Sequence, residues 1–323
     1  MRFHYAAVLF CCFFSSLEST IGPGSRKSSS KSNEKSSSST TAPTPQPLPV
    51  FNKPLSGSPP KSLDPVETNV FKRQLIEENL SAKSILQHHQ SYCSTCVEKR
   101  EFSQATLVYV TPWNSRGYDL AKRFAKKLDY ISPVWLKIKR IAVEQYQVDG
   151  VQDIDEKWME AVKQENPQVR FVPRVIFENW PVDHIHALFK SENEKQQLAA
   201  TLKQFLIDNE RLFDGYVVEF LMQFRGAPKA MSSHILSDIA EQIHSIETNR
   251  TRKEIILAVP PYDELFDKKD FDVLADILDG FSVMTYDFPN QEPGPVAPLR
   301  NEIRRRVNTE FVTFCFLFQP GSK

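Results

Sequence analysis

This chain has no excess of positive or negative charge, and that balance limits the classes of partner it can bind. The 323 residues include 40 basic and 40 acidic side chains, so the formal net charge is zero. Proteins that hold nucleic acid through phosphate contacts carry a basic surface. We therefore expect no nucleic-acid partner, whereas small neutral ligands and proteins are compatible with this composition.

Glycine is scarce as well, with 10 residues against 23 phenylalanines. This composition excludes a collagen-like chain and glycine-rich linkers. No G-x-G-x-x-G follows the first strand-like run, which counts against a dinucleotide site, and we expect no cofactor. Hydrophobic residues make up 41% of the chain, which is enough for one large core.

Apolar runs long enough for a transmembrane helix are also missing. Residues 1–20 contain one early arginine, an apolar run over 5–14 and then small polar residues, the pattern of a secretory signal peptide. We expect this segment to be cleaved and the remaining chain to follow the secretory pathway without a membrane span.

Cysteine is sparse, and its spacing is incomplete for a metal site. Cys93 and Cys96 have the C-x-x-C spacing that redox motifs share with half of a zinc site, but no second C-x-x-C or histidine pair follows. We therefore expect no metal. A thioredoxin-like motif would follow a strand and open a helix, whereas this pair follows "SAKSILQHHQS" and precedes charged "VEKREF". In an oxidising compartment, a disulfide between the two or pairing with another chain is the simpler interpretation.

The segment before the main domain has two parts. Residues 21–65 are dominated by Ser, Lys and Pro and bury too little apolar surface to offset the entropy of ordering, which predicts a disordered linker. Residues 66–104 are predicted to form a polar, mostly helical adaptor. In a secreted chain, the N-x-S/T sequons at Asn79 and Asn249 are possible N-glycosylation sites.

From residue 105, apolar runs alternate with amphipathic stretches. The strand predictions are 106–113, 130–138, 169–177, 213–221, 254–260 and 280–288, and the intervening stretches have helical periodicity. One of them carries a single apolar face made of Ile235, Ile239, Ile243 and Ile246. This α/β alternation predicts a parallel sheet covered by helices, and a closed barrel and an open doubly wound sheet both fit.

Several of these runs together resemble glycoside hydrolase family 18, the chitinases and chitinase-like lectins. They are "FDGYVVEF" (213–220), "GFSVMTYDF" (280–288) and "PGPVAPL" (293–299), and "YVTPWNSRGYD" (109–119) and "SPVWLKIKR" (132–140) resemble its secreted, stabilin-interacting chitinase-like branch. The resemblance implies a (β/α)8 TIM barrel with ligands at the C-terminal ends of its strands. It also implies chitooligosaccharides or related amino-sugar glycans as ligands, an extracellular or lysosomal location and a stabilin-type scavenger or sorting receptor as a partner.

The family pattern at the fourth strand is D-G-x-D-x-D-x-E, whose last Glu protonates the leaving oxygen while the Asp before it orients the N-acetyl group. Here Asp214 matches the first position, but Val217, Glu219 and Leu221 stand at the last three. By the two-residue period of a strand, we expect 217, 219 and 221 to face the barrel interior, and Tyr216, Val218 and Phe220 to face the helices.

Leucine cannot donate a proton, and general acid catalysis contributes about 10²–10⁴-fold. We therefore expect no catalytic residue and almost no family-type hydrolysis. Glu219 would lie one level deeper in the barrel than the donor position. Two interpretations of Glu219 remain open and are compatible: a buried acid paired with Arg174, and a ligand contact.

Further ligand-binding residues are implied by the resemblance. Met284, Tyr286 and Asp287 match the M-x-Y-D that lines the family's sugar subsite, although Met284 and Tyr286 could also be core filling. Aromatic rings near strand ends can stack on pyranose rings or simply pack. The full candidate set is Tyr109, Trp113, Trp135, Trp180, Glu219, Met284, Tyr286 and Asp287.

The sequence departs from the family after residue 300. We count six of eight strands, assign 105–300 to a partial barrel and regard 301–323 as a divergent tail. Its apolar run 311–318 does not alternate and is a candidate driver of aggregation. We expect a C-terminally truncated chain whose sheet has two open edges.

Three functions follow from this pattern. The first is a catalytically inactive, lectin-like chitinase relative that binds amino-sugar oligosaccharides. The second is a protein-interaction or receptor-cargo module with a vestigial sugar groove. The third is a weak glycosidase that uses Glu219.

Overall fold

The apolar runs of the main domain form parallel strands in a computed structural model that describes residues 64–77, 79–98, 100, 103–248, 252–262, 264–284 and 314–317. The predicted signal peptide, almost all of the predicted linker, Asn249, Tyr286 and Asp287 lie outside these residues. All six predicted strand segments are present, two of them split in two: β3 (Thr106–Val110), β4 (Tyr130–Pro133), β5 (Leu136–Ala142), β7 (Arg170–Phe171), β8 (Arg174–Ile176), β9 (Gly215–Glu219), β10 (Glu254–Val259) and β11 (Gly280–Val283).

These strands follow one another around a partial barrel in a mixed α/β fold. Parallel ladders join β3 to β4, β4 to β7, β5 to β8, and then β8, β9, β10 and β11 in order. The inner face carries a small apolar cluster that includes Leu107, Val172, Val217 and Ile256. Their neighbours along each strand belong to the larger core between sheet and helices.

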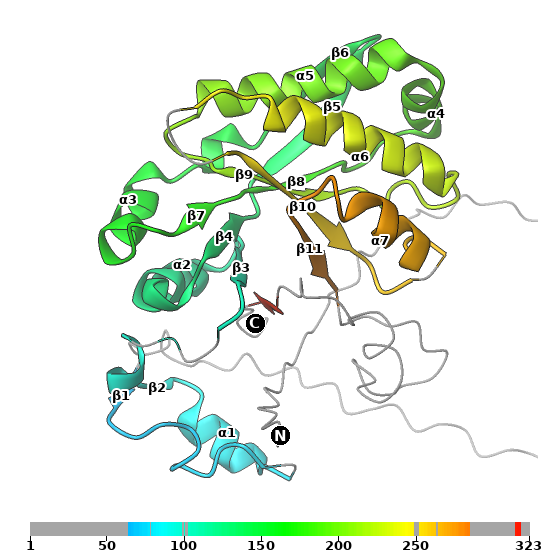
Figure 1. Cartoon of the computed structure of the whole chain (residues 1–323). Coiled ribbons are helices and arrows are strands. Elements are labelled where there is room, and N and C mark those ends of the chain that lie inside the picture. Colours follow the sequence, from blue (N-terminus) through cyan, green and yellow to red (C-terminus); the bar gives the residue numbers. More distant parts are fainter. Residues whose placement is uncertain are drawn as a thin grey trace, which may run out of the picture. The chain divides into compact units, whose positions relative to one another are not determined.

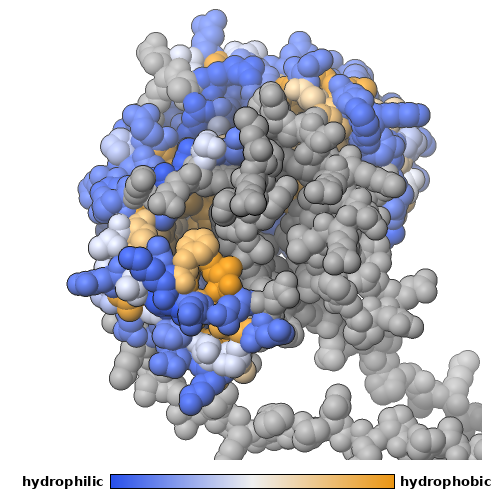
Figure 2. Space-filling model, turned by 60° about the horizontal axis from the view of Figure 1, so that its bottom comes forward, coloured by the Kyte–Doolittle hydropathy of each residue, from blue (hydrophilic) through white to orange (hydrophobic). Residues whose placement is uncertain are grey.

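Helices cover the outside of the strands (Figure 1). They are α2 (Ser115–Arg123), α3 (Glu156–Glu165), α4 (Val182–Lys190), α5 (Glu192–Asp208), α6 (Lys229–His244) and α7 (Lys268–Leu274). The predicted isoleucine face of α6 is buried at Ile235, Ile239 and Ile243. Hydrophilic residues predominate among the coloured atoms of the face shown in Figure 2. None of the helices in the described part is both long and apolar enough to span a bilayer.

Three aspartates join neighbouring strands at their N-terminal ends. Asp129, Asp214 and Asp279 stand directly before β4, β9 and β11. Each accepts a backbone N–H of the preceding strand at 2.8 Å, from Thr106, Phe171 and Ile255 respectively. The backbone N–H of each aspartate donates back to the carbonyl of the same residue, at 2.7–3.2 Å. These bonds join β3 to the start of β4, β7 to the start of β9 and β10 to the start of β11.

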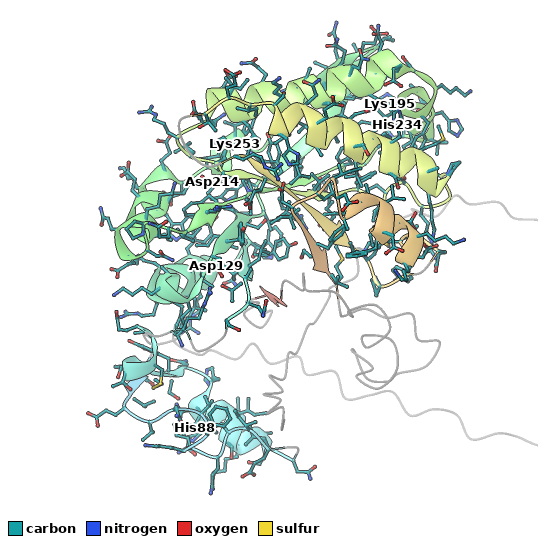
Figure 3. The ribbon with its side chains drawn as sticks, viewed as in Figure 1. His88, Asp129, Lys195, Asp214, His234 and Lys253 are labelled. Carbon is teal, nitrogen blue, oxygen red and sulfur yellow. A yellow bond between two sulfur atoms is a disulfide. The ribbon has the colours of Figure 1, made fainter. Side chains whose placement is uncertain are left out.

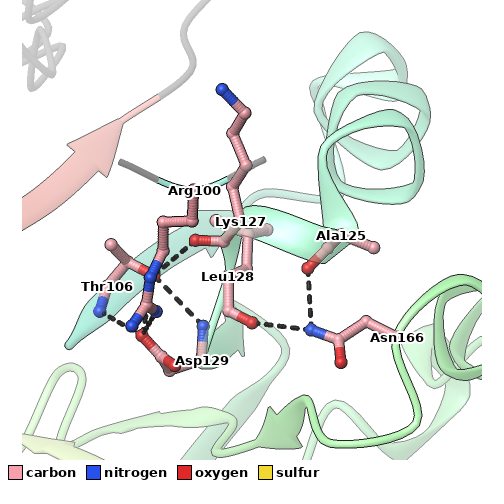
Figure 4. A network of polar contacts seen from close by, with 7 residues as sticks. All are labelled: Arg100, Thr106, Ala125, Lys127, Leu128, Asp129 and Asn166. Atoms are coloured by element: carbon pink, nitrogen blue, oxygen red, sulfur yellow. Dashed lines mark hydrogen bonds and ion pairs between the residues drawn. The ribbon is translucent and has the colours of Figure 1, made fainter. Parts of the chain in front are cut away.

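The Asp129 pair is part of a wider network (Figure 4). The Thr106 hydroxyl donates to the Lys127 carbonyl at 2.8 Å, and Arg100 forms an ion pair with Asp129. Asn166, which follows α3, donates to the carbonyls of Ala125 and Leu128, each at 2.9 Å. These bonds satisfy backbone groups where the chain leaves a helix to begin a strand.

A tight glycine explains the Asp-Gly pair before β9. Gly215 has φ +149°, and a Cβ built there would lie 1.9 Å from the Glu254 carbonyl oxygen of β10. Only glycine allows the two backbones to approach this closely. Asp214 and Gly215 therefore fix the start of the strand, and neither contributes to its C-terminal end.

The C-terminal tail gives a result that the sequence did not predict. Strand β12 (Phe314–Leu317) pairs in parallel with β3, with Leu317 opposite Tyr109. Strand β3 is therefore not an edge strand, because β12 lies on one side and β4 on the other, and β12 is the end strand of this sheet.

The adaptor is less helical than expected. It contains β1 (Asp64–Val66), α1 (Ala82–His88), β2 (Ser91–Cys93) and a 3₁₀ turn at Ser94–Cys96, and β1 pairs in parallel with β2. The disulfide between Cys93 and Cys96 is present, which confirms the local pairing. Asn79 is exposed. The polar composition that suggested a helix is shared by turns, and only seven residues form an α-helix.

An antiparallel hairpin was also missed. Strand β6 (Gln145–Asp149) folds back on β5 through Glu144, which has φ +57°. The hairpin is fixed to α5 by the buried carboxylate of Glu194, which accepts hydrogen bonds from Arg140, the Tyr146 hydroxyl and the Glu144 backbone. The guanidinium of Arg140 is the main reason why the pKa of Glu194 is lowered to about 2.

The aspartate bonds predict a graded loss of stability. Asp214→Ala leaves the Phe171 N–H without its acceptor, and we expect the free energy of unfolding to fall by about 1–3 kcal/mol in urea titrations. Asp214→Asn keeps an acceptor oxygen and should lose less. Asp208→Ala is the control, because Asp208 accepts only from Gln204 on an exposed helix surface. Equal losses in Asp214→Ala and Asp208→Ala would contradict this role.

The Glu194 contacts predict an acid-dependent stability. Because the folded-state pKa lies below the ordinary 4.5, the contribution of Glu194 is complete above about pH 4.5 and is lost as the pH falls toward 2. Its size should be on the order of 2 kcal/mol. Chemical unfolding at stepped pH should show a shallower acid dependence in Glu194→Gln than in the parent chain. Glu160→Gln, at an exposed position of α3, should leave the parent profile unchanged.

Candidate functional site

The inner face of the strands combines an apolar cluster with polar side chains near the C-terminal ends of the strands. Val217 of β9 lies in the inner apolar cluster and Met284 packs against it, as the two-residue period predicted. Tyr109 of β3 belongs to the same cluster, and its hydroxyl lies 2.8 Å from the Ser282 hydroxyl of β11. This contact crosses the interior between strands that are far apart in the sequence.

Glu219 is the last residue of β9 and forms an ion pair with Arg174 of β8. The distance from Arg174 Nη1 to Glu219 Oε2 is 2.9 Å, and the side chains are 23% and 15% exposed. This confirms Arg174 as the partner expected from the sequence. In register, Arg174 lies opposite Val217, so its long side chain reaches one level toward the C-terminal end to meet Glu219.

Three buried polar atoms, on β4, on β8 and just after β3, lack a hydrogen-bond partner among the described residues. They are Nε of Arg174 and the hydroxyl oxygens of Thr111 and Ser132. Ser132 lies opposite Tyr109 in the β3–β4 ladder, and Thr111 follows β3 in the same alternation as Tyr109. Buried polar groups are nearly always bonded, so these three mark a place where a polar ligand or water can bind. Thr111 and Ser132 were not among the residues predicted from the sequence, whereas Arg174 was predicted as the partner of Glu219.

Leu221 does not occupy the expected inward position. Strand β9 ends at Glu219, and Leu221 lies in the following turn, where it is 5% exposed. It packs in the large outer core that also contains Tyr216, Val218 and Phe220. The predicted outward direction of those three residues is thus confirmed, but the common inward face stops at Glu219. Period-two alternation holds only while the backbone stays extended, and the turn ends it.

Of the three candidate tryptophans, Trp135 is buried in the core and Trp180 packs partly buried against it. Trp135 is 2% exposed, donates to the Tyr118 hydroxyl at 2.8 Å and packs edge-on against Trp158. Its neighbour Val134 packs on the inner cluster, so Trp135 points outward by alternation. Its expected role as a sugar platform is therefore wrong.

Trp180 is held in a similar way. Its indole N–H donates to the Ile138 carbonyl at 2.9 Å, and its ring stacks on Tyr146 with centroids 5.9 Å apart. Phe177 and Phe224 pack on it as well. Only Trp113, which follows β3, presents its ring to solvent, with 68% of the residue exposed.

Charged residues at the opposite end of the strands have structural partners. Lys253 is 1% exposed and donates to the carbonyls of Phe213 at 2.6 Å and Glu210 at 3.1 Å. Asp214 of the degenerate motif is bonded to Phe171 at the start of β9, where Figure 3 labels it. Lys253 and Asp214 both lie at the N-terminal ends of their strands, so neither can reach a ligand at the C-terminal ends.

Comparison with known proteins gives one family and a set of similar folds. The model of the family described as "Glycosyl hydrolases family 18" matches residues 105–317, a range that extends beyond the predicted boundary at 300 and includes β12.

Among solved structures, a family 18 chitinase from Cycas revoluta in complex with (GlcNAc)3 is 17% identical, with a TM-score of 0.49, and the match covers 62% of this chain and 61% of that one. A Chromobacterium violaceum chitinase is 20% identical, with a TM-score of 0.45 and 60% of each chain covered. YKL-39, solved in the presence of GlcNAc4, is 14% identical, with a TM-score of 0.47, over 59% of this chain and 54% of its own. This chain thus spans 54–61% of the length of these structures.

The Arg174–Glu219 pair predicts strong coupling between the two side chains. Arg174→Met leaves the Glu219 carboxylate largely buried without its counter-ion, and we expect about 1–3 kcal/mol less stability in urea unfolding. Adding Glu219→Leu should recover much of that loss, because no unpaired charge remains.

The matched control is the pair of Arg225 with Glu264, in which both side chains are 58% exposed. Arg225→Met should change stability by less than about 1 kcal/mol. If the double variant at Arg174 and Glu219 is no more stable than Arg174→Met alone, the two residues are not coupled in the way the geometry indicates.

Proposed function

Because the chain belongs to the glycosyl hydrolases family 18, we propose that it binds chitooligosaccharides or related amino-sugar glycans without hydrolysing them. The binding place is the inner surface at the C-terminal ends of β3, β8, β9 and β11. The observation that carries this proposal is the single ion-paired acid, Glu219, in a motif whose last position is Leu221.

The absence of hydrolysis follows from proton transfer. Cleavage by the family route needs a carboxylic acid that protonates the leaving oxygen, and Leu221 offers only hydrocarbon. Glu219 is an unsuitable substitute because its Oε2 is already bonded to the Arg174 guanidinium at 2.9 Å and because it lies two residues before the donor position. The third function considered from the sequence, a glycosidase that uses Glu219, is therefore disfavoured.

Sugar binding is supported by the kind of groups that remain. Amino sugars carry hydroxyls and an N-acetyl amide, which can bond to the spare donor on Arg174 and to the hydroxyls of Thr111 and Ser132. Met284 supplies an apolar contact on the inner face. The exposed ring of Trp113 can stack on a pyranose face.

A second function is favoured by the burial of Trp135, which removes one of the three expected platforms, and by the packing of Trp180 on Tyr146, Phe177 and Phe224. In that case the chain is a protein-interaction module, such as cargo for a stabilin-type scavenger or sorting receptor, with a vestigial groove. Under either function we propose an extracellular or lysosomal protein with an N-terminal signal peptide.

Calorimetric titration of chitotetraose into the full chain tests this proposal. We expect binding, and about tenfold weaker binding in Trp113→Ala if one stacking contact of roughly 1.4 kcal/mol is lost. Cellotetraose, which lacks the N-acetyl groups, should bind less well. A parallel assay should detect no chain cleavage in the parent or in Glu219→Gln.

Each alternative gives a different result in the same experiment. No chitotetraose binding by the parent chain would favour the interaction module. Hydrolysis by the parent chain that disappears in Glu219→Gln would favour the glycosidase and remove the proposal of an inactive site.

A further inference from the structure

Three potential metal ligands meet on the outer surface where α5 packs against α6. Glu192 is the first residue of α5, and His234 and Asp238 lie one turn apart on α6. The distance from His234 Nε2 to Glu192 Oε2 is 3.5 Å, and to Asp238 Oδ2 it is 3.8 Å. Figure 3 labels His234 beside Lys195, which is the next-turn neighbour of Glu192.

This spacing is that of a small coordination shell. Ligand atoms about 2.0–2.2 Å from a tetrahedral zinc ion lie about 3.3–3.6 Å from one another. The three ligand atoms here all lie within 4.8 Å of one another, so small side-chain rotations would complete the geometry. One imidazole and two carboxylates form a ligand set that suits zinc and neighbouring divalent metals, and solvent can fill the fourth position because His234 is 51% exposed.

Asp238 gives an independent reason to expect a cation. Its Oδ2 atom is buried and has no hydrogen-bond partner within the described part of the chain. An orphaned carboxylate oxygen destabilises the fold, and a bound cation removes that penalty.

We propose that Glu192, His234 and Asp238 bind a zinc-class divalent cation that fastens α5 to α6. The Lys195 ammonium lies 2.7 Å from Oε2 of Glu192, the same oxygen that lies 3.5 Å from His234. A metal would therefore displace Lys195 from this oxygen or bind Glu192 through its other oxygen. The sequence analysis expected no metal because it considered only the cysteines, while these ligands come from two helices. The site lies outside the barrel interior and does not depend on sugar binding.

The charges around the site also allow a metal-free arrangement. A protonated His234 would place one positive charge between Glu192 and Asp238, while Lys195 is already paired with Glu192 and Glu241 adds a further negative charge near Asp238. The histidine alone leaves Asp238 Oδ2 at 3.8 Å, beyond hydrogen-bond distance. A divalent ion contacts both carboxylates at once.

Metal titration of the full-length chain, produced without a histidine tag and stripped with chelator, tests the proposal. We expect Co²⁺ to give the visible absorption of a four-coordinate site and Zn²⁺ to displace it at one equivalent. Zn²⁺ should also raise the thermal midpoint, because it binds only the folded chain. Ca²⁺, which prefers six to eight oxygen ligands, should compete poorly.

Variants locate the site. His234→Ala and Asp238→Asn should each raise the Zn²⁺ dissociation constant at least about tenfold and abolish the thermal shift. His186→Ala, at an exposed position on α4, should behave as the parent chain. Zn²⁺ binding that persists unchanged in both site variants overturns the proposal. So does a parent chain that binds neither metal, a result that would leave protonated His234 as the counter-ion.

Discussion

The barrel of this chain depends on one repeated contact, a carboxylate that bonds to the backbone of the preceding strand. Asp129, Asp214 and Asp279 each follow a buried apolar residue and each form a two-way bond with the strand before them. A parallel strand pair has no hairpin turn to set its register, because a helix intervenes between the strands. These bonds fix the register at the N-terminal ends, where the chain enters each strand.

Fixing one end of the strands determines what the other end presents. Once Asp214 and Gly215 define the start of β9, Val217 and Glu219 must face the interior, and Arg174 of β8 comes within reach of Glu219. The two acids of the same strand therefore have separate tasks. Asp214 holds the fold, while Glu219 lies at the end where barrels bind their ligands.

The sequence was most informative where physical periodicity is strict. The six apolar segments and the isoleucine face of α6 were predictable because strands and long helices repeat every 2 and 3.6 residues. The predicted directions of the Trp135 and Leu221 side chains were wrong because both residues lie outside a strand. Trp135 lies between β4 and β5, and Leu221 follows the end of β9, so the alternation of an extended strand does not apply to them. The β5–β6 hairpin and the Glu192, His234 and Asp238 group depend on contacts between distant segments, which periodicity cannot show.

The neighbours of Glu219 favour recognition over catalysis in the interior. A general acid for glycoside cleavage must remain protonated near neutral pH, which requires an apolar or negatively charged environment. Glu219 instead lies beside Arg174, whose Nη1 is 2.9 Å from its Oε2, and the hydrophobic Leu221 packs in the outer core. What remains at the C-terminal ends is a neutral ion pair, two unpartnered hydroxyls and a spare guanidinium donor in the described residues. Such groups match the hydroxyls and amides of a neutral sugar, the ligand class that we propose.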